Sequence, residues 1–173
     1  MEKHKHKILV PLDGSEFGRQ IFPHIHKFFS PQENRLILLR VGDDPPGHVG
    51  HPARPAAPDS NVEMFENRAD YVETQHPIFA SQERESILAE MEQALAPELT
   101  DLKEAGFDVE TAVRFGHRGE AIVDFVDSKS VDMVAMTTHW RTGISKLIFG
   151  SVAQHVARHV SVPIVMVHPQ DAV

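Results

Sequence analysis

The chain has 173 residues, of which 41% are hydrophobic, and its formal net charge is -8 at pH 7. This length favours one domain with a sizeable core, and the negative charge argues against broad electrostatic binding to nucleic acid or to an anionic membrane. The sequence has no cysteine, which excludes disulfides and thiolate chemistry, and we expect a cytoplasmic location. No apolar run approaches the roughly 18 residues of a membrane span.

The first part of the chain reads as a strand, a helix and a second strand. Residues 8–10 form a continuous apolar run, which is typical of a strand covered on both faces, so we expect a strand over residues 7–12. Ser15 suits the cap of a helix that runs to about residue 29, and Pro23 predicts a kink in it. Residues 35–41 are expected to form the second strand.

A long insertion of different composition follows over residues 42–80. Its first part is rich in proline and is unable to bury enough apolar area to offset its ordering entropy. We expect a long loop within a single domain of residues 1–173, with a turn of helix over residues 61–71.

The second half alternates helices with strands. The longest helical pattern is residues 81–105, in which Pro97 implies a kink or a break and Gly106 suits the position just after the end. Alternating apolar residues favour an edge strand next, and a turn over residues 116–119 precedes a short helix. The alternation predicts an α/β fold with an open, doubly wound parallel sheet. The elements expected in this half are helix 81–105, strand 107–115, helix 120–128, strand 131–137, helix 151–160 and strand 164–167.

The loop between strand 131–137 and helix 151–160 draws attention because its residues are small, polar and basic. Gly150 and Ser151 fall where a helix begins, and a serine N-cap with free N–H groups around it suits an anion. Arg141 and Lys146 add positive charge. The pattern indicates a phosphate cradle, and the alternative is an ordinary capped helix. If strands one and four are neighbours, Asp13 shares the crevice at their carboxyl ends.

Five segments, in the correct order, resemble the universal stress protein family. Pro11-Leu12-Asp13-Gly14-Ser15 is similar to the family's first-strand signature, P-x-D-G-S. Residues 116–122, 131–134, 142–152 and 161–167 resemble its third turn, fourth strand, final loop and helix, and closing strand. The resemblance covers nearly the whole chain outside the insertion.

The resemblance implies a Rossmann-like fold of five parallel strands in the order 3-2-1-4-5. It implies a stress-response protein that binds ATP or AMP, with Mg²⁺ accompanying ATP, and homodimers that pair through their last strands. Asp13 and Val41 would line the adenine pocket, although Asp13 also suits a plain turn and Met133 plain sheet core. The residues carried over to the nucleotide site are Pro11, Leu12, Asp13, Val41, Met133, Thr137, His139, Arg141, Gly150 and Ser151.

The sequence departs from the family's nucleotide motif, G-x2-G-x9-G-[ST]. Counting back from Gly150 and Ser151 puts Trp140 at the second glycine and Thr137 at the first. Trp140 would block a phosphate, point outward or stack on a base or ribose. The alternative function is therefore a nucleotide-free dimeric interaction module in which Trp140 occupies the phosphate site and residues 42–80 form the surface for a protein partner.

Other chemistries lack their signatures. The G-x-S-x-G elbow, the Walker loop and G-x-G-x-x-G are all absent from the sequence, so no catalytic residue is assigned and at most slow ATP hydrolysis is expected. Among the 12 histidines, His155 and His159 are four residues apart on one helix face, but no further ligand completes a metal set. We expect them to be solvated surface residues.

Overall fold

The computed structural model describes residues 5–43, 77–138 and 150–169, with the backbone alone for residues 77–83. The chain divides into two compact units, residues 1–43 together with 91–173, and residues 44–90. All five strands belong to the first unit. The predicted turn of helix over residues 61–71 lies outside the described residues.

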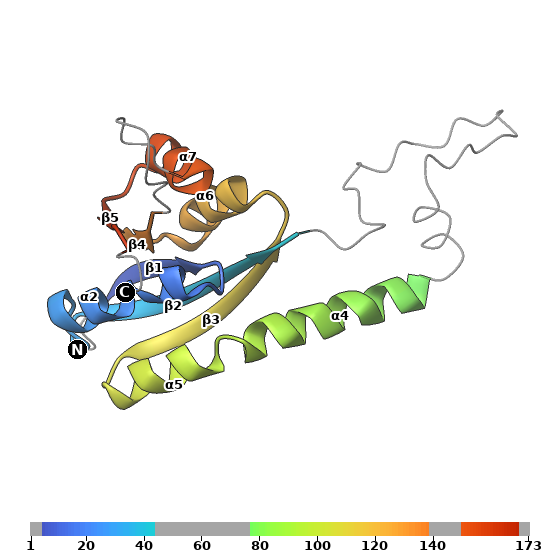
Figure 1. The fold of residues 1–173 in the computed structure, drawn as a ribbon, viewed down its shortest axis with the longest axis horizontal. Helices are drawn as coiled ribbons and strands as arrows, with labels where there is room; N and C mark the ends of the chain where they lie inside the picture. The colour runs from blue at the N-terminus through green and yellow to red at the C-terminus, as the bar shows by residue number, and fades with distance from the viewer. Residues whose placement is uncertain (1–4, 44–76, 139–149, 170–173) are drawn as a thin grey trace, which may run out of the picture. The chain divides into compact units, whose positions relative to one another are not determined.

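Five parallel strands form one sheet in the order β3-β2-β1-β4-β5 (Figure 1). This order confirms the predicted doubly wound α/β fold, with β3 at an edge and β1 next to β4. The continuous apolar run of β1 arises because its alternate side chains are buried on opposite faces. The strands are β1 (His6–Leu12), β2 (Asn34–Gly42), β3 (Asp108–Phe115), β4 (Met133–Thr137) and β5 (Ile164–Val167).

Helices cover both faces of the sheet, and Figure 1 shows α6 and α7 on one side and α5 on the other. One core cluster joins β1 and β2 to α2 and α5, through Ile25 and Leu102 among others. The second joins the opposite face of the same strands to α6 and α7, through Phe125 and Val156. The described helices are α1 (Glu16–Arg19), α2 (Phe22–Phe28), α4 (Pro77–Gln93), α5 (Ala96–Glu104), α6 (Arg118–Lys129) and α7 (Ser151–His159).

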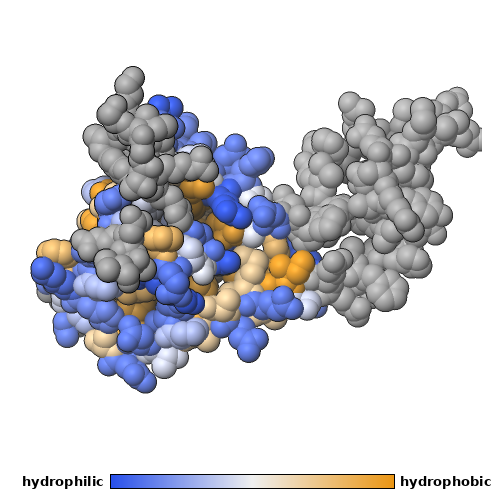
Figure 2. Space-filling view, viewed as in Figure 1, coloured by the Kyte–Doolittle hydropathy of each residue, from blue (hydrophilic) through white to orange (hydrophobic). Residues whose placement is uncertain are grey.

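The described part of the chain exposes few large hydrophobic side chains. In the view of Figure 2, hydrophilic residues cover most of its surface. Phe17 and Phe28, on α1 and α2, are the large hydrophobic side chains that the described part of the chain exposes. The apolar residues are therefore concentrated in the two clusters, which hold the helices against the two faces of the sheet.

Two predicted helices are each divided by a proline. The helix expected from Ser15 to residue 29 is two helices, α1 and α2, and the one expected over residues 81–105 is α4 and α5. Pro23 and Pro97 each stand in the first turn of the second helix. Proline lacks an N–H and is best tolerated there, so it begins a new helix where a kink or break was expected.

Two helix ends follow the sequence closely. Ser15 caps α1, because its side chain accepts a hydrogen bond from the amide of Gly18. Gly106 follows the end of α5 with a φ of 90°, and the amide of Phe107 donates to the carbonyl of Leu102 at 3.0 Å. This is the Schellman arrangement, in which a glycine accepts the left-handed conformation without strain.

Candidate functional site

A crevice opens where the chain direction across the sheet reverses, between β1 and β4. Strand β1 is in register with β2 from His6 to Leu12, but with β4 at Ile8 and Leu9. Beyond Leu9, β1 is in register with β2 alone. Beyond Val134, β4 is in register with β5 alone. In open α/β sheets ligands bind at this reversal point.

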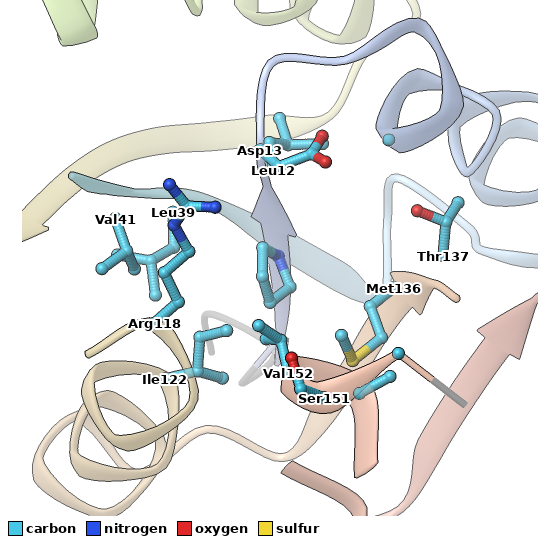
Figure 3. Close-up of a pocket in the computed structure, with 14 residues that line it drawn as sticks. Leu12, Asp13, Leu39, Val41, Arg118, Ile122, Met136, Thr137, Ser151 and Val152 are labelled. Carbon is cyan, nitrogen blue, oxygen red and sulfur yellow. The ribbon is translucent and has the colours of Figure 1, made fainter. Parts of the chain in front are cut away.

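A cavity of about 280 Å³ occupies the crevice (Figure 3). Its volume is close to the lower end of the range for small-molecule sites. Three strands, the loop after β1, and the first turns of α6 and α7 contribute to its walls. The lining residues are Pro11, Leu12, Asp13, Gly18, Leu39, Val41, Arg118, Ile122, Met136, Thr137, Gly150, Ser151, Val152 and Ala153.

The loop after β1 is held by a short chain of hydrogen bonds. The Oδ1 atom of Asp13 accepts from the amide of Ser15 at 2.9 Å and from its hydroxyl at 2.7 Å. The Ser15 hydroxyl oxygen accepts in turn from the amide of Gly18 at 3.0 Å. A Cβ atom at Gly18 would lie 2.5 Å from Asp13 Oδ1, so glycine is needed for this approach. Asp13 is thus both a turn residue and a residue of the cavity wall.

One side of the cavity is apolar. Leu39 and Val41 are two residues apart on β2, so they point to the same face of the sheet, and both are buried. Ile122 of α6 and Met136 of β4 complete this side and are also buried. Such a surface suits a flat, weakly polar ring.

A polar side of the cavity comes from the first turn of α7. Gly150 is the N-cap residue and makes no side-chain cap bond, and Ser151 is the first residue of the helix. The prediction that Ser151 is the N-cap is therefore wrong by one position. The amide of Gln154 donates to the carbonyl of Gly150 at 2.9 Å. The three preceding N–H groups lie in a first turn, where helices lack internal acceptors and favour an anion.

The structure brings most of the predicted nucleotide residues to this cavity, and their role in binding stays a prediction. Met133 does not line the cavity, since it packs against the core cluster on the other face of the sheet. His139 and Arg141 lie outside the described residues, as do Trp140 and Lys146. The predicted residues that line the cavity are Pro11, Leu12, Asp13, Val41, Thr137, Gly150 and Ser151.

Sequence reasoning missed half of the wall. Alternation along a strand could have found Leu39 from Val41, but it could not have chosen Met136 over Met133, because the two are an odd number of residues apart and Thr137, beside Met136, also lines the cavity. Arg118 belongs to the predicted turn over residues 116–119, but it is the first residue of α6. The remaining lining residues that were not predicted are Gly18, Ile122, Val152 and Ala153.

The two histidines of α7 contact each other. Their rings stack with centroids 4.2 Å apart, and Nδ1 of His159 lies 2.8 Å from the carbonyl oxygen of His155. Within residues 5–43, 84–138 and 150–169, no three His, Cys, Asp or Glu side chains gather as a metal would require. Across the helices that the structure describes, none has the length and apolar character to cross a membrane.

The chain is similar to known proteins in its sequence and in its fold. Residues 5–168 match the model of the Universal stress protein family. The chain is 27% identical over 170 residues to universal stress protein MJ0577 of Methanocaldococcus jannaschii, covering 96% of each chain. It is 24% identical over 161 residues to universal stress protein MJ0531 of the same organism, covering 93% of this chain and 81% of the relative.

Solved structures show the same fold. The structure of MJ0577 superposes with a TM-score of 0.64 at 21% identity, covering 96% of this chain and 97% of that one. A universal stress protein family member of Arabidopsis thaliana with AMP bound has a TM-score of 0.58 at 13% identity, covering 96% and 93%. A universal stress protein in complex with cAMP has a TM-score of 0.52 at 19% identity, covering 96% and 98%. Because the family model spans nearly the whole chain, this protein belongs to the universal stress protein family.

Proposed function

We propose that this protein binds an adenine nucleotide, ATP or AMP, in the cavity between β1 and β4, and that it acts in the stress response through its bound state. The observation that carries the proposal is the pairing of an apolar wall with a helix N-terminus in one cavity. Binding of AMP by the Arabidopsis relative and of cAMP by another supports an adenine nucleotide as the ligand.

The base lies against the apolar side, where Leu39, Val41 and Ile122 are buried. Moving a purine from water to this surface costs little free energy, because its ring faces are weakly hydrated and its burial removes apolar surface from water. Asp13, at the end of β1, accepts from hydroxyl or amino groups of the ligand. The Asp13 loop is already organised by Ser15, so binding does not have to order it.

The phosphates lie at the first turn of α7, beside Gly150 and Ser151. The free N–H groups and the helix dipole favour negative charge there, and Gly150 has no Cβ to keep a phosphate at a distance. The described residues gather no set of carboxylates that would hold a cation alone. Mg²⁺ would therefore be bound mainly by the phosphates of ATP, with Asp13 as the carboxylate among the described residues of the cavity wall.

Calorimetric titration of nucleotide-stripped protein tests the proposal. We expect micromolar affinity for ATP with Mg²⁺ or for AMP, about 8 kcal/mol of binding free energy. The combined change Asp13→Ala with Ser151→Ala should abolish it. Asp124→Ala with Ser161→Ala is the matched control, because both residues lie outside the cavity wall. No binding heat at millimolar nucleotide would contradict the proposal.

The same titration distinguishes the proposed function from the alternative, a nucleotide-free interaction module in which Trp140 occupies the phosphate site. Trp140 is the only tryptophan, so its fluorescence reports on a ligand near it. In the alternative, the wild-type protein binds nothing and Trp140→Gly creates ATP affinity. In the proposal, the wild-type protein binds and Trp140→Gly changes the affinity little.

We also propose a homodimer, formed through β5. This strand lies at an edge of the sheet, next to β4, and its four residues are half-buried. An edge strand presents unpaired backbone groups that a second copy can satisfy. Sedimentation equilibrium at micromolar concentration should give twice the mass of 19.4 kDa. A monomer under those conditions would refute the dimer and leave the nucleotide proposal unaffected.

A further inference from the structure

Arg118 is the cationic side chain among the described residues that line the cavity. It is the first residue of α6, after the N-cap residue His117. Its position breaks a local rule, because a cation in the first turn of a helix opposes the helix dipole. Residues that break such a rule without an evident structural gain are candidates for a functional role.

The structural gain from Arg118 is small. Its Nη2 atom lies 3.4 Å from the Oδ2 atom of Asp43, and the two side chains are 52% and 85% exposed. Exposed ion pairs of this kind contribute little, because water screens both charges and the long side chains lose entropy. The guanidinium can therefore leave Asp43 at little cost.

The neighbours of Arg118 on the cavity wall are apolar. Ile122 lies four residues further along α6, on the same helix face. In the view of Figure 3, the side chain of Arg118 rises past Ile122 and extends across the side of the cavity formed by Leu39 and Val41. This is the side that the base occupies in the proposed function, and the first turn of α7 lies on a different wall.

We propose that Arg118 stacks its guanidinium on the face of the bound base, which is thereby held between the cation and the apolar side chains of Leu39 and Val41. A planar guanidinium stacks on an aromatic ring, whereas the ammonium of lysine does not. Cation–π attraction of this kind strengthens as water is excluded. The inference rests on the proposed function and names Arg118 as the residue that strengthens recognition of the base.

Titration with adenosine, AMP and ATP distinguishes a base contact from a phosphate contact. We expect Arg118→Ala and Arg118→Met to weaken all three ligands by the same factor, about fivefold to thirtyfold. Arg118→Lys should not restore the affinity, since it keeps the charge and loses the plane. Arg158→Ala is the matched control, because Arg158 is an exposed arginine on α7 outside the cavity wall, and it should leave all three affinities unchanged.

Asp43 provides a second, independent arm. If Asp43 competes with the base for the guanidinium, Asp43→Asn should strengthen adenosine binding about twofold in the wild-type background, within the range of an exposed ion pair. The same change should have no effect in the Arg118→Ala background. Such a double-mutant cycle isolates the coupling between the two residues.

The outcomes that overturn the inference are specific. A loss in Arg118→Ala that grows with the number of phosphates, and that Arg118→Lys restores, would show a phosphate contact. Unchanged affinity in Arg118→Ala, in a wild-type protein that binds nucleotide, would refute the inference and leave the proposed function standing. A wild-type protein that binds none of the three ligands would refute both.

Discussion

The Oδ1 atom of Asp13 accepts two hydrogen bonds from Ser15, from the amide at 2.9 Å and from the hydroxyl at 2.7 Å. The same hydroxyl oxygen accepts from the amide of Gly18 and so caps α1. One serine thereby links the end of β1, the cavity wall and the start of a helix. Any change at Ser15 should affect stability and ligand affinity together.

We expect Ser15→Ala to lower the free energy of unfolding by about 1 kcal/mol, the usual cost of removing a serine N-cap. Affinity for AMP should fall as well, because Asp13 loses the hydroxyl that orients it. Urea unfolding and calorimetric titration measure the two effects. Ser161→Ala, an exposed serine outside the cavity wall, is the control. An unchanged urea midpoint in Ser15→Ala would contradict the capping role.

Gly119 of α6 lies close to the ring of His155 of α7. A Cβ atom at Gly119 would lie 2.9 Å from two ring atoms of His155, closer than side chains pack. Alanine normally stabilises a helix relative to glycine. Here we expect Gly119→Ala to destabilise the protein by about 1–3 kcal/mol, as overpacked positions do.

The matching test is a double-mutant cycle measured by urea unfolding. In the His155→Ala background the ring is gone, so Gly119→Ala should be neutral or stabilising. If Gly119→Ala destabilised the protein equally in both backgrounds, the cost would not come from contact with His155.

Alanine substitutions at Gly14 and Gly106 distinguish the cost of backbone strain from the cost of a side-chain contact. Both have positive φ, 79° and 90°. A Cβ atom at Gly14 would meet the guanidinium of Arg40, whereas one at Gly106 would meet only Pro31 Cβ at 3.8 Å. Gly106→Ala should cost about 1–2 kcal/mol, from the left-handed backbone alone.

Gly14→Ala should cost about as much as Gly106→Ala, because a Cβ atom at Gly14 would meet only the far end of the flexible Arg40 side chain, which can move aside at little cost. Removing Arg40 by Arg40→Ala should therefore leave the cost at Gly14 unchanged. Urea unfolding of the single and double variants measures each value. A cost at Gly14 that exceeded the cost at Gly106 and fell in the Arg40→Ala background would contradict this and show that Arg40 is held in place.

Glu98 of α5 is almost buried, at 9% exposure, and binds Arg19 of α1 with Oε1 and Nε 2.6 Å apart. This hydrogen bond, and then the charge of Glu98, raise the pKa of Arg19 above its ordinary value. A raised pKa means that the pair stabilises the folded state. This contribution is fully present below the unfolded pKa of arginine and is lost only above about pH 12.

We therefore expect Glu98→Gln to lower the urea midpoint by the same amount at pH 6 and at pH 9. Glu104→Gln, an exposed change on the same helix, is the control and should have little effect at either pH. A difference between wild type and Glu98→Gln that changed across this interval would mean that another group titrates with the pair.

The sequence by itself determined the strands and several helix ends, because those depend on local chemistry. Residues 8–10 are apolar on both faces, Ser15 caps a helix and Gly106 accepts a positive φ, and each of these signals acts within a few residues. The resemblance to the family then supplied the strand order, which the structure confirms. Proline was read correctly as an interruption, but whether it kinks a helix or begins a new one depends on how each half packs.

Only the tertiary structure decided which side chains share the cavity. Met133 and Met136 are similar residues on one strand, and the face of the sheet that each occupies depends on the register with β1. Arg118 reaches the cavity because α6 begins two residues earlier than its apolar pattern indicated and packs over β2. A site formed by strands and helices from both ends of the chain is set by long-range packing, so residues far apart in the sequence meet there without any local signal that marks them as neighbours.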